Sequence, residues 1–200
     1  MKKILFATFL TLIVLSSCSS DNDNQNLIPL TQSEIDDLKF LREEEKLARD
    51  VYLFSYNKYQ SEIFNSISLS EQKHMDSVLK LMNKYGIPDS SSTEIGVFNN
   101  SNLQSLYTAL TTQSDISVIE ALKVGATIED LDINDIDDFI INTTKSDLLK
   151  VYNNLTCGSK NHIRSYTSQL TINGITYIPQ FISIEYYNII LSSSISGCGN

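Results

Sequence analysis

The sequence has few of the residues that usually carry chemistry. Its 200 residues include no tryptophan, two histidines, three cysteines and three prolines. It also lacks a C-x-x-C pair, a G-x-x-x-x-G-K-[ST] loop, a dinucleotide-binding glycine pattern and a G-x-S-x-G motif. These absences argue against a thioredoxin-like redox protein, a P-loop nucleotide enzyme, a Rossmann dehydrogenase and an α/β-hydrolase.

No long apolar run marks the N-terminus as a membrane span. The run Ile4 to Leu15 has 12 residues, whereas a spanning helix needs about 20. It follows two lysines and ends in Leu15-Ser-Ser-Cys18, a pattern typical of a secretory signal. The ending resembles the bacterial lipoprotein signal, in which Cys18 becomes the lipidated first residue, and a plain cleaved signal is the alternative. We therefore predict a signal peptide over residues 1–17 and a cell-envelope protein anchored to a membrane through Cys18.

Positive charge is scarce as well. There are 15 Lys and Arg against 24 Asp and Glu, a net charge of −9. Without Lys2 and Lys3 the balance is 13 against 24, a net charge of −11. Such an excess argues against nucleic acid as a partner, because phosphates bind Lys and Arg.

Residues 18–32 are predicted to be a flexible tether, since Ser19 to Asn26 contains no apolar residue. Residues 33–200 are long enough for one domain with a core. Once Cys18 is modified, Cys157 and Cys198 remain as an even pair. In an exported protein this pair is compatible with a disulfide, and two free thiols are the alternative.

The rest of the chain shows helical periodicity and no convincing series of strands. We predict four long helices over residues 33–59, 62–85, 116–141 and 145–170, with Ser33 as the first N-cap. Residues 86–114 form a long connection around a short helix at 102–110, and a last short helix lies within 181–191. Two helical hairpins joined by one crossover predict an all-α four-helix bundle of ferritin-like connectivity with a C-terminal appendage.

The positions of four side chains along the predicted helices agree in depth. Glu45 lies 15 residues before the first hairpin turn, and His74 lies 14 residues after it. Glu129 lies 16 residues before the second turn, and His162 lies 17 after it. Because a helix rises about 1.5 Å per residue, all four side chains should meet at the middle of the bundle.

The phases of these residues agree with their depth. Glu45 interrupts an apolar stripe, Glu71 and His74 are three residues apart on one face, and Glu129 shares a face with Asp132. Carboxylates crowded in a core repel one another unless a cation lies between them. The sequence therefore predicts a metal site made of Glu45, Glu71, His74, Glu129, His162 and Asp132. Glu43, Glu44 and Asp50 are expected to be solvated charges.

Several stretches resemble a known family. The pattern resembles the ferritin-like di-iron carboxylate proteins, in particular the rubrerythrin-like branch, on Glu45-Lys-Leu-Ala48-Arg-Asp-Val-Tyr52, Glu71-Gln-Lys-His74, Glu129 and His162-Ile-Arg-Ser-Tyr166. Over about residues 33–190 the sequence resembles the ferritin-like domain DUF2202. The stretches that carry this resemblance are Leu41-Arg-Glu-Glu-Glu45-Lys, Glu120-Ala-Leu-Lys-Val-Gly125, Leu131-Asp132-Ile133 and Gly158-Ser-Lys-Asn-His162. The resemblance implies a four-helix bundle with a metal centre.

The di-iron pattern asks for Glu-x-x-His on the fourth helix, and this chain departs from it. The fourth helix reads Ser159-x-x-His162, and serine cannot supply the carboxylate. Three glutamates and two histidines remain, with Asp132 or solvent to fill the gap. The sequence is therefore compatible with a two-iron centre, with a single-metal site or with an asymmetric site.

Mixed carboxylate and imidazole ligands suit iron, manganese and zinc. The expected function is that of an exported, lipid-anchored, ferritin-like protein that carries out iron-dependent oxidation or peroxide chemistry. The alternative is a non-catalytic interaction module of the cell envelope that has lost its metal. The sequence leaves open whether the protein is an enzyme and whether it forms a homodimer.

Overall fold

The computed structural model describes residues 28–194 and 197–198. Within these residues the chain forms helices and no strand: α1 (Gln32–Tyr59), α2 (Glu62–Lys84), α3 (Ser101–Ser114), α4 (Val118–Ile141), α5 (Ser146–Ile172) and α6 (Ile184–Ser192). The predicted all-α fold is confirmed. Among these helices none has the length and apolar character needed to cross a membrane. The predicted signal peptide, Cys18 and the segment Ser19 to Asn26 lie outside the described residues.

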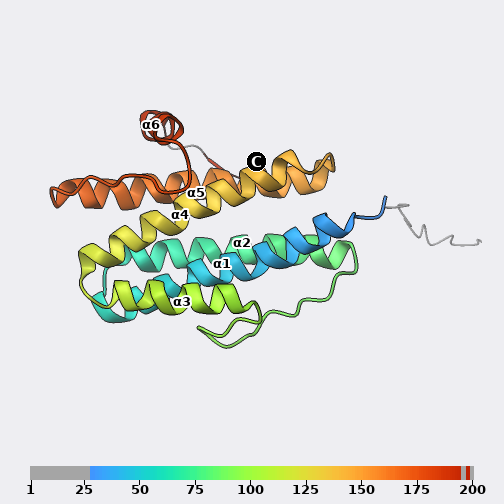
Figure 1. Ribbon diagram of the computed structural model, residues 1–200, viewed down its shortest axis with the longest axis horizontal. Coiled ribbons are helices and arrows are strands. Elements are labelled where there is room, and N and C mark those ends of the chain that lie inside the picture. Colours follow the sequence, from blue (N-terminus) through green and yellow to red (C-terminus); the bar gives the residue numbers. More distant parts are fainter. Residues whose placement is uncertain (1–27, 195–196, 199–200) are drawn as a thin grey trace, which may run out of the picture.

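The four long helices pack in two antiparallel hairpins. α1 lies along α2 and α4 lies along α5, and contacts of α1 with α4 and of α2 with α5 join the two layers (Figure 1). The connection from α2 to α4 crosses the length of the bundle and contains α3, which packs on α1 and α4. α6 rests against α5 outside the bundle. The predicted helices are all present, and α3 begins one residue before the predicted piece and ends four residues after it.

The first helix begins with a capping box whose N-cap, Thr31, lies two residues before the predicted N-cap. The backbone N–H of Glu34 donates to the Thr31 hydroxyl (3.2 Å), and the Glu34 carboxylate accepts from the Thr31 N–H (2.8 Å). The prediction of Ser33 as the N-cap was therefore wrong, because the Thr31-x-x-Glu34 pair satisfies two free backbone donors at once. The hydroxyl of Thr143 also donates to Glu34 (2.6 Å), which joins this helix start to the turn after α4.

The apolar core is divided into two clusters by a polar layer. One cluster includes the buried apolar side chains of residues 47–52 of α1, 64–67 of α2 and 163–170 of α5. The other includes residues 38–41, 78–82 and 148–155 of the same helices. The buried face of each of these helices thus carries apolar residues on both sides of a polar segment, and these segments lie at the same level near the middle of the bundle. The residues at that level form the candidate site.

Charged residues of α1 hold the crossover connection in place. The Glu43 carboxylate accepts from the N–H groups of Asn99 and Asn100 (2.8 and 2.9 Å) at the start of α3. Lys46 donates to Asp50 (2.6 Å), and the Asp50 carboxylate also accepts from the N–H of Gly96 (2.9 Å). The expectation that Glu43, Glu44 and Asp50 are solvated was wrong, since they are 8, 4 and 0 % exposed. The connection covers the face that carries Glu43 and Asp50.

The C-terminal tail is fixed to the bundle at two points. Asp130 on α4 accepts from the N–H groups of Gln180, Phe181 and Ile182 (2.5, 3.2 and 3.0 Å) and from the Tyr177 hydroxyl (2.8 Å). A disulfide joins Cys157 on α5 to Cys198, with 5.7 Å between the Cα atoms. The tail is thereby held against the outer side of α4 and α5.

Candidate metal centre

Five of the predicted site residues meet at one level, and they come from all four long helices. Glu45 extends from α1, Glu71 and His74 from α2, Glu129 from α4 and His162 from α5. The three glutamates are at most 2 % exposed. The two imidazole rings stack with their centroids 5.6 Å apart. The depth argument therefore placed these side chains at the correct level.

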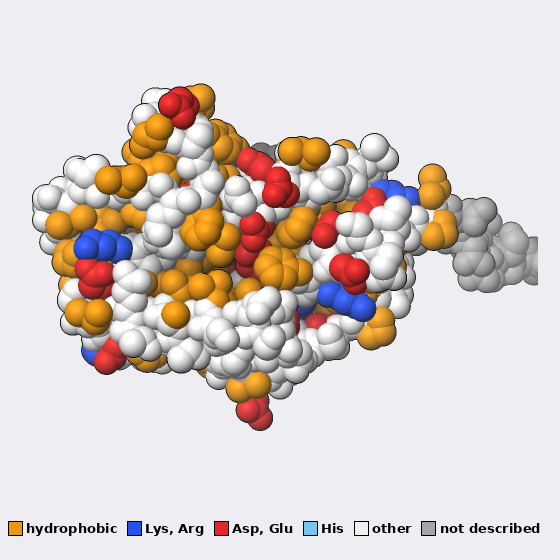
Figure 2. Space-filling model, viewed as in Figure 1, with side chains coloured by type: hydrophobic (Ala, Val, Ile, Leu, Met, Phe, Trp, Pro, Cys, Tyr) orange, Lys and Arg blue, Asp and Glu red, His pale blue; other side chains and the backbone are white. Residues whose placement is uncertain are grey.

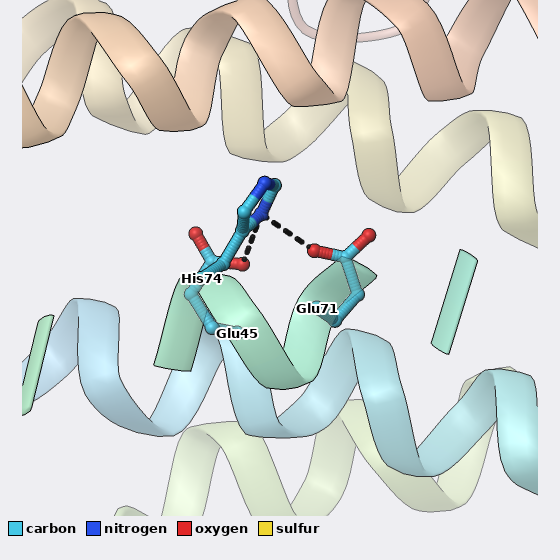
Figure 3. A group of neighbouring side chains, drawn as sticks. All are labelled: Glu45, Glu71 and His74. Carbon is cyan, nitrogen blue, oxygen red and sulfur yellow. Dashed lines mark hydrogen bonds and ion pairs between the residues drawn. The ribbon is translucent and has the colours of Figure 1, made fainter. Parts of the chain in front are cut away.

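Glu71 lies between the two histidines and offers one oxygen to each. Its Oε2 is 2.7 Å from Nδ1 of His74, which is also 3.2 Å from Oε2 of Glu45 (Figure 3). Its Oε1 is 2.8 Å from Nδ1 of His162, which is also 3.3 Å from Oε2 of Glu129. Two three-residue groups result, and we call them group 1 (Glu45, Glu71, His74) and group 2 (Glu71, Glu129, His162). In each group, one ligand atom per residue lies within 4.8 Å of the others.

The charges of the site are arranged as they would be around a cation. Burial, only partly offset by His74, raises the pKa of Glu45 to about 7. Burial opposes charge on Glu71 too, but attraction by His162 and His74 is stronger and lowers its pKa. Burial disfavours the charged form of His162, yet the negative charges of Glu71 and Glu129 raise its pKa to about 10. In the metal-free protein, protons on the imidazoles therefore supply the positive charge among these carboxylates.

Asp132 lies beside the two groups and is a member of neither. The hydroxyl of Ser159, which is fully buried, donates to its Oδ2, and its Oδ1 has no hydrogen-bond partner among the described residues. Burial and the negative charges of Glu45 and Glu129 raise the pKa of Asp132 well above its usual value. Ser159 thus binds the carboxylate that we expected to take the place of the missing fourth-helix glutamate.

Two further residues support the site at close range. The Tyr52 hydroxyl donates to Oε1 of Glu129 (2.5 Å), which fixes the orientation of that carboxylate. Gly158 faces the ring of His74, and a Cβ at this position would lie 2.5 Å from Nε2. Sequence reasoning missed Gly158, although a glycine inside a helix is costly and often marks a close approach.

The outer edges of the histidines face a surface pocket between α2 and α5. This pocket has a volume of about 450 Å³, and its lining includes His74, His162, Lys73, Asn154 and Asn161. Nε2 of His162 is 3.0 Å from the hydroxyl of Ser70. Each ring therefore directs Nδ1 toward the carboxylates, whereas Nε2 of His162 faces Ser70 and Nε2 of His74 faces Gly158. This orientation leaves Nδ1 available as a metal ligand, while Nε2 can donate to a neighbour or to solvent.

The arrangement could hold a metal ion, since both groups combine imidazole nitrogen with carboxylate oxygen.

Residues 34–194 match the family described as an uncharacterized protein domain, DUF2202. The chain belongs to this family. The DUF2202 chain is 50% identical over 167 residues to the uncharacterized protein MJ0754 of Methanocaldococcus jannaschii. The aligned region covers 83% of this chain and 90% of that protein. The crystal structure of that hypothetical protein superposes with a TM-score of 0.83 at 48% identity and covers 85% of this chain and 98% of that one.

Proposed function

We propose that this DUF2202 protein is a ferritin-like metal protein in which groups 1 and 2 each hold one metal ion and share Glu71. One observation carries the proposal: the two oxygens of Glu71 face two different histidine Nδ1 atoms, at 2.7 and 2.8 Å. Two metal ions in the core would need a carboxylate between them and further carboxylates beside them to balance their charge. Glu71 lies in such a position, and Glu45 and Glu129 lie beside it. In the metal-free protein, the imidazole rings of His74 and His162 lie against these carboxylates.

Iron is the metal we propose, with manganese and zinc as the alternatives that the same ligands accept. When bound, iron would supply oxidation or peroxide chemistry. Glu71, Glu45 and Glu129 would hold the ions, Tyr52 would orient Glu129, and the apolar clusters on both sides would exclude bulk water. Ser159 provides no carboxylate on the fourth helix, so the site has one carboxylate fewer than the four-glutamate pattern, and a small ligand could take that place.

Metal analysis of protein purified without chelators tests the proposal. We expect about two metal ions per chain, and loading with Fe²⁺ should raise the melting temperature, because a ligand that binds only the folded state stabilises it. A folded, stable protein that stays empty after incubation with Fe²⁺, Mn²⁺ and Zn²⁺ would exclude the metal centre. That result would favour the interaction module instead.

We also infer that the protein is exported and lipid-anchored. Two features support this location: the signal pattern that ends at Cys18, and the disulfide between Cys157 and Cys198, which persists in oxidising compartments. The Cys18→Ala variant, expressed in a bacterium that lipidates such signals, should move from the membrane fraction to the soluble fraction. A variant that stays in the membrane fraction contradicts the anchor.

A further inference from the structure

Glu44, the neighbour of Glu45 on α1, is a buried carboxylate without a hydrogen-bond donor. It is 4 % exposed, and neither of its oxygens has a hydrogen-bond partner among the described residues. Burying a polar group without compensation costs several kcal/mol, and a charged one costs more. Glu44 belongs to neither group 1 nor group 2, so these groups do not explain its burial.

The charged neighbours of Glu44 are acids. Asp132, Asp135 and Glu45 all repel a negative charge on it. Asp132 has an unpartnered oxygen of its own, as does Glu45. Asp135 is half-buried and accepts from the side chain of Asn134 (3.1 Å). Acidic side chains gather near the centre of the face where α4 meets α1 (Figure 2). Carboxylates thus run from the surface at Asp135, past Glu44 and Asp132, to Glu45.

We infer that Glu44, Asp132 and Asp135 form an uptake route for divalent cations between α1 and α4, which delivers the ion to Glu45. This inference rests on the metal centre proposed above. Carboxylate oxygens are the ligands that hard divalent cations prefer, and a row of one charge sign concentrates counter-ions and speeds their arrival. Among the described residues, only groups 1 and 2 gather three ligand atoms within 4.8 Å. The row therefore attracts a cation without a preformed site to retain it.

The opposite side of the bundle is less favourable for a cation. There the pocket between α2 and α5 is lined by Lys73 and by the rings of His74 and His162, and no carboxylate is among the described residues that line it. A cation that arrives from this side meets the ammonium group of Lys73 before it reaches a carboxylate. Uptake through the seam of α1 and α4 avoids that barrier.

A hydrogen bond offers another explanation for Glu44. If its carboxyl is protonated, it can donate to Asp135, and the burial then needs no cation. The two explanations differ in kinetics. An uptake route affects the rate of metal loading, whereas a hydrogen bond between two acids affects only stability.

The experiment follows uptake of Co²⁺ by the full chain after metal removal, through the visible absorption of bound Co²⁺ in a stopped-flow instrument. Glu44→Gln and Asp135→Asn each replace one carboxyl group with an amide and preserve side-chain size. Asp36→Asn is the matched control, because Asp36 is an exposed acid at the start of α1. Circular dichroism checks that each variant is folded, and the half-exposed Asp135 provides a second test if Glu44→Gln does not fold.

We expect the second-order rate of uptake to fall about tenfold in Glu44→Gln and in Asp135→Asn. The final Co²⁺ content should equal that of the wild type, and Asp36→Asn should load at the wild-type rate. Full loading at unchanged rates in both seam variants overturns the route and leaves the metal centre standing. If the wild-type protein binds no Co²⁺, the metal centre fails and the route fails with it.

Discussion

The Glu71→Gln substitution should abolish tight metal binding in group 1 and group 2 together. Glu71 is the one residue common to both groups, with an oxygen 2.7 Å from His74 and another 2.8 Å from His162. Loss of a residue that only hydrogen-bonds to a metal ligand already weakens binding by about 10 to 100-fold. Loss of a ligand should therefore cost at least about 100-fold at each position, or about 2.7 kcal/mol.

Glu45→Gln is the matched comparison for this test. Glu45 belongs to group 1 alone, so this variant should keep about one metal ion per chain where Glu71→Gln keeps none. Elemental analysis after dialysis gives the metal content, and circular dichroism verifies that the helices are intact. Wild-type content in Glu71→Gln, or equal losses in the two variants, would refute the shared carboxylate.

Three other predictions concern protons, the fourth helix and the disulfide. Metal binding should release protons, since carboxylates raise the pKa of His74 and bring that of His162 to about 10. The affinity for metal should therefore rise with pH across the neutral range, and calorimetry in buffers of different ionisation enthalpy counts the released protons. Ser159→Glu should lower the melting temperature without metal, because it adds a carboxylate at a fully buried position. It should also tighten the binding of the second ion, and thermal scans with and without metal show both effects. Replacing Cys157 and Cys198 with serine should cost about 2–4 kcal/mol in denaturant unfolding, and two free thiols in the oxidised wild type would contradict the bridge.

The helices could be predicted because their apolar residues repeat at helical spacing and their ends carry turn residues. The second helix illustrates this: it was predicted to end at residue 85, and Gly86, in a left-handed conformation, follows the end of α2. The start of α1 was misplaced because Ser33 and Thr31 are both good caps. The Thr31-x-x-Glu34 spacing distinguishes them, because Glu34 completes a capping box with Thr31 whereas Ser33 is followed three residues later by Asp36. The contact of Glu34 with Thr143 could not be predicted, because Thr143 is distant in the sequence.

The convergence of Glu45, His74, Glu129 and His162 could be predicted from helix rise and hairpin turns alone. The role of Glu71 as the shared residue could not, since it depends on which direction each oxygen faces. The burial of Glu43 and Glu44 was also beyond the sequence. These residues follow Arg42 in a run of charges that reads as a solvated face, and only tertiary packing covers it.

Asp130 links the interior of the bundle to its outside. It follows Glu129 directly on α4, and its carboxylate holds the amides of Gln180, Phe181 and Ile182 while Glu129 faces His162. A movement of α4 that follows the Glu129 carboxylate must also stretch or release these amide contacts. Hydrogen exchange at residues 180–182 thus reports on the centre of the bundle from its surface, without a probe placed in the core.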